Sequence, residues 1–399
     1  MNKIKKANLI ITGWILAVLG LFLFSFTQID LGLTLTRISF WQIIQKKFQL
    51  IGYFHRPLSA FLYLVILVLL FSFYLLILKS VQKKWLTSKQ MWKIILITTL
   101  ILWFSYNAFS YDLFNYIFDA KILVFYHQNP YEYKALDFPN DPMLGFMHWT
   151  HRPSAYPPLW IGISVIPFLL GFGKLIPLIL AFKGLMLGAY LGTIWLIGKI
   201  SKILTPKREL FNLAFYAFSP LVIIESLVSA HNDVLMIFFG LLGFYLLLKK
   251  RNFLAFLPWL FSIGIKLLTV FLLPLFPYVF WEKIKNRKID KQKLTLGAIL
   301  LMTLGFLFVS FRLGHQPWYW LWLLPFIALK TENRWGFWLT TGLSFGSLLR
   351  YLPFLYYGHW DPPVPEIKFW LLGLGLVLGL LMIFLEKVKL LSKNGFTFN

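Results

Sequence analysis

The stretch "NLIITGWILAVLGLFLFSFT", residues 8–27, carries no charged side chain over its whole length. A helix of about 20 apolar residues is long enough to cross the hydrocarbon core of a bilayer. The stretch follows the basic segment "MNKIKK" and so resembles a signal peptide, but it is long for one and lacks a small-residue cleavage site. We therefore predict that it is the first retained membrane-spanning helix.

Similar apolar blocks recur along the 399 residues, of which 59% are hydrophobic and 19% aromatic. The net charge is +24, yet most lysines and arginines lie in short segments between these blocks. That pattern is typical of the cytoplasmic loops of membrane proteins and needs no nucleic-acid partner. The chain has no cysteine, which excludes disulfides, thiolate metal sites and cysteine nucleophiles. These features predict a multi-pass protein of the inner or plasma membrane.

The basic segments predict the topology of one integral membrane domain over residues 1–399. We expect an all-α bundle of about 12 spans with both termini in the cytoplasm. The block 156–173 is rich in proline, and the parity of the basic loops requires that it does not cross, so we predict a re-entrant or tilted helix. The predicted spans are 8–27, 58–78, 94–109, 176–197, 211–229, 233–248, 252–265, 266–281, 294–312, 318–330, 335–357 and 368–386.

The segment 28–57 would face outward on this topology, although it carries several cations. Its sequence "LTLTRISFWQIIQKKFQLIG" can form an amphipathic helix on the membrane surface, with its cations near lipid phosphates. The alternative is that this segment lies in the cytoplasm.

Residues 111–155 form a long loop rich in polar, aromatic and turn-forming residues, expected between spans three and four on the extracytoplasmic face. In a helix, Asp112, Tyr116 and Asp119 share one face, and the two aspartates are about 10.5 Å apart along the axis. They are too far apart to share a proton and could bracket a sugar. Alternatively, Asp112 only caps the helix, and Asp119 pairs with Lys121 or faces solvent.

Four further features are expected at the same membrane face. They are the end of the loop with His151, Arg152 and Tyr156, the turn His231-Asn232-Asp233, the intramembrane Lys266, and the boundary segment with Arg312, His315 and Trp318. An ammonium group inside the bilayer is costly and usually functional. The structural alternatives are that Asp233 caps a helix, Lys266 snorkels to the surface and the tryptophans form an interfacial belt.

Carboxylates beside cations and an aromatic rim suit a sugar carried on a lipid phosphate. An aspartate would take the proton of the acceptor hydroxyl, cations would stabilise the departing phosphate, and an apolar groove would hold the prenyl tail. We expect Lys266, Arg152 and His315 near the phosphate. The sequence contains neither a nucleotide-phosphate loop nor a His-Glu-x-x-His motif.

The rival hypothesis is a transporter or flippase for lipid-linked sugars. Transporters usually combine repeated halves with ionisable groups at the bilayer midplane. No internal repeat is evident, and the intramembrane charges are limited to Lys183, Glu225 and Lys266. We therefore favour an enzyme.

The order of "YDLFNYIFDAKILV", "NPYEY", "HRPSAYPPLW", "FSPLVIIESLVSAHNDVLM", "IGIKLLTVFLLP" and "HQPWYWLWLLPF" over residues 94–330 resembles the GT-C superfamily of polyprenyl-phosphate-sugar-dependent glycosyltransferases. The resemblance is to the branch of GPI-anchor mannosyltransferase I and bacterial polyprenyl-phosphate-mannose mannosyltransferases. It implies an inverting mannosyltransferase with a glycan or glycolipid acceptor and an extracytoplasmic site.

The same resemblance implies that Asp112 is the catalytic base, that Asp119 matches a second acidic position and that His231-Asn232-Asp233 matches a polar turn. Those eukaryotic relatives carry an Asp-x-Asp pair, whereas this chain has Ser110 two residues before Asp112. The metal ligands are therefore unknown, and the use of a divalent cation stays open.

Overall fold

The computed structural model describes residues 3–393, whose regular elements are all helices, with no strand among them. This confirms the predicted all-α class. The helices are α1 (Lys3–Ser25), α2 (Ser39–Gln49), α3 (Arg56–Gln82), α4 (Ser88–Trp103), α5 (Asp112–Val124), α6 (Pro158–Leu170), α7 (Leu175–Leu204), α8 (Glu209–Ala217), α9 (Pro220–Ile223), α10 (Asp233–Leu248), α11 (Asn252–Ile265), α12 (Leu275–Ile284), α13 (Lys291–Leu313), α14 (Trp320–Ala328), α15 (Arg334–Leu349), α16 (Tyr351–Tyr357) and α17 (Val364–Lys393). Short 3-10 or π turns are η1 (Phe26–Gln28), η2 (Leu50–Phe54), η3 (Ala135–Asp137), η4 (Pro142–Gly145), η5 (Pro206–Arg208), η6 (Ile224–Val228), η7 (Leu267–Leu272) and η8 (Pro317–Tyr319).

Six helical segments in the described part of the chain are long and apolar enough to cross a membrane, and all six overlap predicted spans. They are Lys3–Gln28, Arg56–Gln82, Leu175–Leu204, Leu267–Ile284, Lys291–Leu313 and Val364–Val388. The bent pair Pro206–Ala217 and Pro220–Val228 would add a seventh. Helices α4, α10 and α11 have only 16, 16 and 14 residues, so the count of about 12 spans stays a prediction.

Some predicted spans are not continuous helices. The span 211–229 bends by 51° before Pro220, whose ring removes a backbone donor from the helix. The span 335–357 is divided between α15 and α16, and only nine residues of 318–330 form α14. The predicted non-crossing block 156–173 contains the 13-residue helix α6, and its relation to the membrane stays a prediction.

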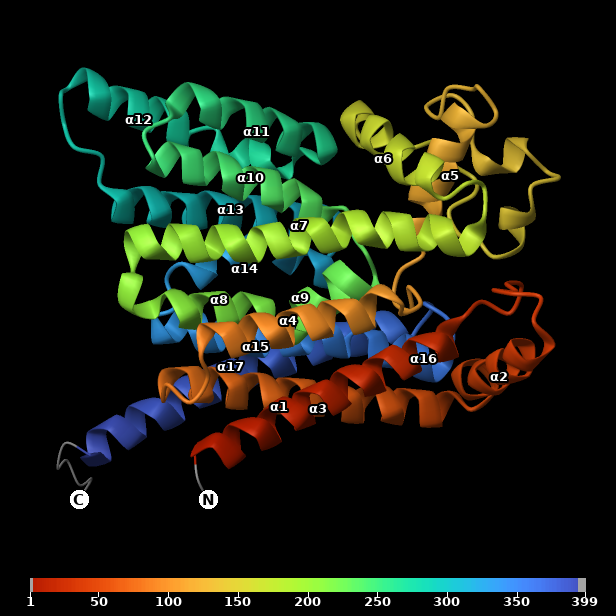
Figure 1. Cartoon of the computed structure of the whole chain (residues 1–399), viewed down its shortest axis with the longest axis horizontal. Coiled ribbons are helices and arrows are strands. Elements are labelled where there is room, and N and C mark those ends of the chain that lie inside the picture. The colour runs from red at the N-terminus through yellow and green to blue at the C-terminus, as the bar shows by residue number, and fades with distance from the viewer. Residues whose placement is uncertain (1–2, 394–399) are drawn as a thin grey trace.

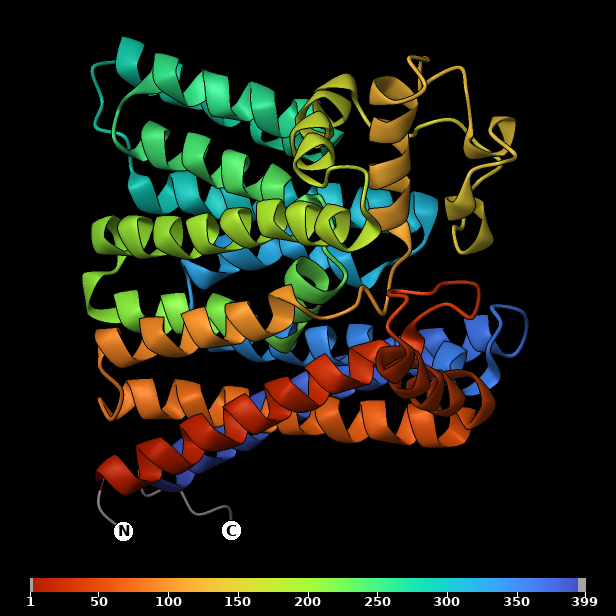
Figure 2. The ribbon, with the colours of Figure 1, turned by 45° about the vertical axis from the view of Figure 1, so that its right-hand side comes forward.

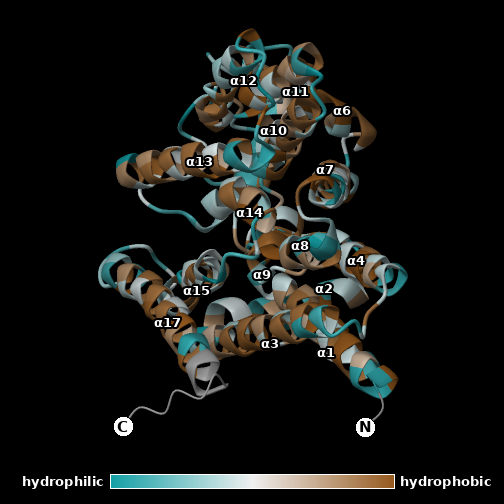
Figure 3. Cartoon of the chain, turned by 90° about the vertical axis from the view of Figure 1, so that its left-hand side faces the viewer, coloured by the Kyte–Doolittle hydropathy of each residue, from teal (hydrophilic) through white to brown (hydrophobic). Residues whose placement is uncertain are grey.

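The two ends of the bundle differ in character. The N-terminus and the connections α3–α4, α7–α8 and α12–α13 lie at one end, and residues 111–157 lie at the opposite end (Figures 1 and 2). Figure 3 looks onto the first of these ends and shows hydrophobic flanks along α13, α17 and α1. On α17, the apolar side chains Phe369, Trp370, Val377 and Phe384 are exposed, as expected of surfaces that face lipid.

The segment 28–57 lies at the same end as the loop 111–155 (Figures 1 and 2). A Cβ atom on Gly32 would lie 2.2 Å from the carbonyl oxygen of Gly145, so the two backbones are in direct contact. The segment 28–57 therefore lies on the same side of the bundle as the loop, and the side of the membrane that both face stays a prediction.

Helix α2 is the amphipathic helix expected in this segment. Phe40 and Ile43 are exposed, whereas Gln45 and Gln49 are buried. Their side-chain amides donate to the carbonyl oxygens of Leu33 and Asp30, at 2.6 and 2.9 Å. Polar groups therefore hold the helix to the protein and leave apolar groups outside, as an interfacial helix requires.

Lys183, one of the three charges predicted to lie inside the membrane, is buried in α7. Its Nζ donates to the carbonyl and the hydroxyl oxygen of Ser105, at 2.5 and 2.7 Å. Ser105 follows the last turn of α4, where carbonyl groups lack helical partners and a cation is favourable. Lys183 thus has a structural explanation.

Helices α15 and α17 pack through glycines, which allow a close approach of two membrane helices. A Cβ atom on Gly375 would lie 2.5 Å from the carbonyl oxygen of Gly342 and 2.7 Å from the Cα of Gly346. Two helix backbones therefore meet where a side chain would otherwise separate them.

We expect Gly375→Ala to lower the free energy of unfolding by about 1–3 kcal/mol, because the new methyl group overpacks this contact. Gly373→Ala is the matched control, since nothing lies within 4 Å of its added Cβ. Thermal unfolding in detergent measures both variants. Equal stability of the two would contradict the close packing of α15 on α17.

Candidate active site

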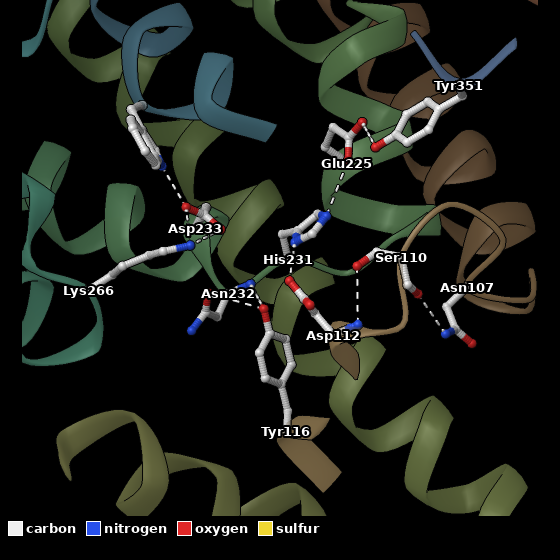
Figure 4. A network of polar contacts seen from close by, with 11 residues as sticks. Asn107, Ser110, Asp112, Tyr116, Glu225, His231, Asn232, Asp233, Lys266 and Tyr351 are labelled. Carbon is white, nitrogen blue, oxygen red and sulfur yellow. Dashed lines mark hydrogen bonds and ion pairs between the residues drawn. The ribbon is translucent and has the colours of Figure 1, made fainter. Parts of the chain in front are cut away.

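A cluster of polar side chains lies where α5, the turn 229–232 and the start of α10 meet (Figure 4). We call it the polar cluster. Its members come from five segments of the chain, and several are buried in an otherwise apolar interior. The polar cluster comprises Asp112, Tyr116, Glu225, His231, Asn232, Asp233 and Lys266.

The broken helix α9–η6 places two of these side chains beside one another. After the π turn η6, Ala230 adopts a left-handed conformation with φ of 56°. The backbone N–H of His231 then donates to the carbonyl oxygen of Glu225 at 3.1 Å. This bond fixes the two residues relative to each other.

Asp112 is the first residue of α5, but its carboxylate does not cap that helix. Its backbone N–H instead donates to the hydroxyl of Ser110 at 3.1 Å, and its Oδ2 lies 3.4 Å from Nδ1 of His231. The Asp112 side chain is 22% exposed, whereas His231 is fully buried. The capping alternative is wrong, and Asp112 is the outward edge of the polar cluster.

His231 lies between two carboxylates. Its Nε2 is 3.4 Å from Oε2 of the buried Glu225, and the hydroxyl of Tyr351 donates to Oε1 of Glu225 at 3.0 Å. The imidazole stacks on Trp318 with ring centroids 4.4 Å apart. A continuous chain of polar contacts therefore runs from α16 to the edge of the site, through Tyr351, Glu225, His231 and Asp112.

Asp233 and Lys266 form the second ion pair of the polar cluster. Nζ of Lys266 is 2.8 Å from both carboxylate oxygens of Asp233, and the indole N–H of Trp322 donates to Oδ1. The carboxylate of Asp233 is fully buried and Lys266 is 27% exposed. Lys266 therefore pairs inside the protein, and the snorkelling alternative is wrong, as is the proposal that Asp233 serves only as a cap.

Tyr116 links α5 to the turn 229–232. Its hydroxyl donates to Oδ1 of Asn232 at 3.3 Å. Its ring makes edge contacts with Tyr156 and Trp160, at centroid distances of 5.0 and 4.9 Å. The predicted residues Tyr116, Asn232 and Tyr156 are thus brought together.

Asp119 is buried further along α5, where its Oδ2 accepts a hydrogen bond from the hydroxyl of Ser154 at 2.7 Å. Lys121 pairs with Asp141 instead, so both structural alternatives for Asp119 are wrong. Burial raises the pKa of Asp119 to about 7, against the opposing effects of Ser154 and Arg152. At neutral pH this carboxyl can therefore donate as well as accept a hydrogen bond.

The charges around Asp112 favour its ionised form. Burial raises the pKa of Asp112, but the contact with His231 and the charges of His231, Lys266 and Arg152 together hold that pKa below its usual value. Burial lowers the pKa of His231, whereas Asp112 and Glu225 raise it more strongly, to about 9. At neutral pH an imidazolium therefore lies between two carboxylates.

Other predicted residues lie outside these contacts. Arg152 and His151 are exposed, with the Arg152 guanidinium 4.8 Å from the ring of Trp149. His315 contacts the hydroxyl of Ser347 at 2.9 Å, and Arg312 is exposed in the last turn of α13. Burial lowers the pKa of His315 to about 3, so this ring is neutral and does not supply the cation expected of it.

Sequence reasoning did not assign a site role to Glu225, Tyr351, Trp322 or Ser154. An acid within an apolar run, six residues before a histidine, was a usable signal for Glu225. Tyr351 and Trp322 come from distant segments whose patterns are those of ordinary membrane helices. Only the packing of the bundle brings them to the polar cluster.

Within residues 3–393, no three histidine or carboxylate side chains come close enough together to hold a metal ion. The use of a divalent cation was left open by the sequence, and it stays open.

Comparison with known proteins assigns the chain to a family. Neither the curated proteins nor the solved structures give a match. A family model described as "Alpha-(1->6)-mannopyranosyltransferase, N-terminal domain" matches residues 14–282, which is more than half of the chain and includes Asp112, Glu225, His231, Asp233 and Lys266. This match supports the mannosyltransferase activity expected from the sequence. The chain therefore belongs to the MptA_B family of alpha-(1->6)-mannopyranosyltransferases.

Proposed function

We propose that this protein transfers mannose from a polyprenyl-phosphate donor to a glycan or glycolipid acceptor, with Asp112 as general base. The observation that carries the proposal is the placement of Asp112. Its partly exposed carboxylate contacts His231 through one oxygen, Oδ2, which leaves the other oxygen to accept a proton. The family description supports an α-(1→6) linkage.

The step balances without a further reactant. The acceptor oxygen attacks the anomeric carbon of mannose while its proton passes to Asp112. The bond from the anomeric carbon to the phosphate oxygen breaks, and polyprenyl phosphate leaves. Because this displacement inverts the anomeric carbon, an α product requires a β-linked donor.

Lys266 and Arg152 are the cations that we assign to the phosphate. Both lower the pKa of Asp112 through their charges, so their positive charge acts on the proposed base. Lys266 is partly exposed beyond its pair with Asp233, and Arg152 is exposed on the loop. Such groups stabilise the negative charge that develops on a leaving phosphate.

Asp119 is the second acid of the proposed site. With Ser154 as its partner, we assign it to orienting a sugar hydroxyl, because a half-protonated carboxyl can donate or accept. The positive-inside pattern supports placing this end of the bundle on the extracytoplasmic face. The narrower resemblance to GPI-anchor mannosyltransferase I stays a prediction.

An apolar groove of about 460 Å³ lies at the same end of the bundle. It is lined by residues that precede and begin α2, by the residues that directly follow α4 and by the start of α7, including Trp41, Tyr106 and Ile179. The chain runs from the groove at 104–106 to Asp112 within a few residues. We assign this groove to the hydrocarbon tail of the donor.

The experiment that tests the function uses the purified full chain in proteoliposomes. Labelled polyprenyl-phosphate-mannose and a synthetic alkyl α-mannoside should give a labelled dimannoside, whereas GDP-mannose should give none. A transporter would instead move the labelled lipid between leaflets without forming product. The described residues offer no specific observation in favour of that rival.

The groove makes a separate prediction. We expect Ile179→Trp to raise the KM for a long-chain donor about tenfold, which corresponds to about 1.4 kcal/mol of lost binding. The KM for a donor shortened to two isoprene units should change little. Ile166→Trp, on the exposed side of α6, is the control. Equal effects on both donors would remove the groove from the proposal.

A further inference from the structure

Glu225 is a buried carboxylate without a role in the step proposed above. It is fully buried in η6 and contacts Tyr351 through one oxygen and His231 through the other. A buried carboxylate is costly unless it is paired. Through His231, Glu225 is linked to Asp112.

The geometry sets the protonation of His231. Nδ1 faces Oδ2 of Asp112 and Nε2 faces Oε2 of Glu225, each at 3.4 Å. A neutral imidazole carries hydrogen on only one nitrogen, so one of the two facing carboxylate oxygens would then meet a lone pair. Only the imidazolium presents a donor to both.

The ring also has little freedom to turn. One face stacks on Trp318, and the backbone of His231 is bonded to the carbonyl oxygen of Glu225 itself. Tyr351 fixes the other end of the chain from α16. Tyr351 and Glu225 therefore fix the orientation of the His231 ring, and this ring fixes the orientation of the Asp112 carboxylate.

We propose that Glu225 is a positioning residue, which acts through His231 to hold the carboxylate of Asp112 ionised and oriented toward the acceptor hydroxyl. This inference rests on the proposed function. Glu225 neither gains nor loses a proton in the step, since the acceptor proton goes to Asp112. The raised pKa of His231 agrees with this arrangement.

Other ionisable groups face the same region. Lys266 and Arg152 act on Asp112 through their charges, and Asp233 lies beside Lys266. The phenols of Tyr116 and Tyr156 lie here as well, and burial together with the charge of Asp112 raises their pKa. The phenol of Tyr351 donates to Glu225. Of the imidazoles, only His231 contacts Asp112 in the described part of the chain. We therefore expect it to set the alkaline limit of activity.

The test compares the pH dependence of kcat/KM for the wild type, Glu225→Gln and Glu225→Asp in proteoliposomes. Removing the charge of Glu225 lowers the pKa of His231, because an opposite charge favours the imidazolium. We expect the alkaline limb of Glu225→Gln to move down by at least about one pH unit. We also expect kcat to fall about tenfold or more, a part of the ~10²–10⁴ supplied by general base catalysis.

Glu225→Asp keeps the charge and should keep the alkaline limb within a few tenths of a pH unit of the wild type. A lower kcat for Glu225→Gln with an unchanged pH profile would mean a structural role and would overturn the inference. If Glu225→Gln does not fold, Tyr351→Phe tests the same chain of contacts from α16. It should lower kcat without changing the donor KM, and a wild-type kcat would overturn the inference.

The two proposals fail in different ways. A wild-type protein without any transfer overturns the proposed function, and the inference falls with it. An active wild type with an unchanged Glu225→Gln profile overturns the inference alone.

Discussion

Replacing Asp112 with asparagine is expected to reduce mannosyl transfer by ~10²–10⁴, the contribution typical of a general base. Asparagine keeps the size and shape of the side chain but cannot accept the acceptor proton. The donor KM should change little, because Lys266 and Arg152 remain in place. Turnover with labelled polyprenyl-phosphate-mannose measures the effect.

Glu132→Gln is the matched control, since Glu132 is an exposed carboxylate of the same loop and should keep wild-type turnover. Asp112→Asn also removes one of the two partners of the His231 imidazolium, so its thermal unfolding must be measured alongside. A folded Asp112→Asn protein that retains wild-type turnover would rule out Asp112 as the base.

Lys266→Ala is expected to have the largest effect on stability, about 3–5 kcal/mol, because it leaves the buried carboxylate of Asp233 without its cation. It should also weaken donor binding, since Lys266 is one of the two cations assigned to the phosphate. The two effects have different causes and can be separated.

The double variant Lys266→Ala/Asp233→Asn separates them. Asparagine at 233 removes the unpaired charge and can still accept the hydrogen bond from Trp322, so most of the stability should return. Donor affinity should stay low, because the cation is still absent. If donor affinity returns together with stability, Lys266 has only a structural role.

Long, uniformly apolar segments were predictable from sequence, because hydrophobicity and length alone determine whether a helix can cross a bilayer. The segments around α1, α3, α7, α13 and α17 show this. The interruptions were harder to predict. Pro220 breaks a helix inside an apolar segment, where periodicity gives no signal. The predicted boundary between 252–265 and 266–281, in contrast, matches the end of α11 at the extended residue Lys266.

The candidate site was predictable where polar residues were close in sequence. Helical spacing placed Asp112, Tyr116 and Asp119 on one face of the helix that is α5. The residues His231, Asn232 and Asp233 were recognisable as a polar turn. The pairs Asp112–His231, Asp233–Lys266 and Glu225–Tyr351 join distant segments, so no local pattern reveals them. His315 and Arg312 show the converse, because proximity to the membrane boundary did not bring them to the polar cluster.

Three aromatic residues from the last third of the chain complete contacts of the polar cluster. Trp318 stacks on His231, Trp322 bonds to Asp233 and Tyr351 bonds to Glu225. All three lie beyond residue 282, where the family match ends. The matched region alone would therefore contain the acids and the lysine but not the three aromatic side chains that contact them. A fragment cut at that boundary would lack three contacts that hold the polar cluster together.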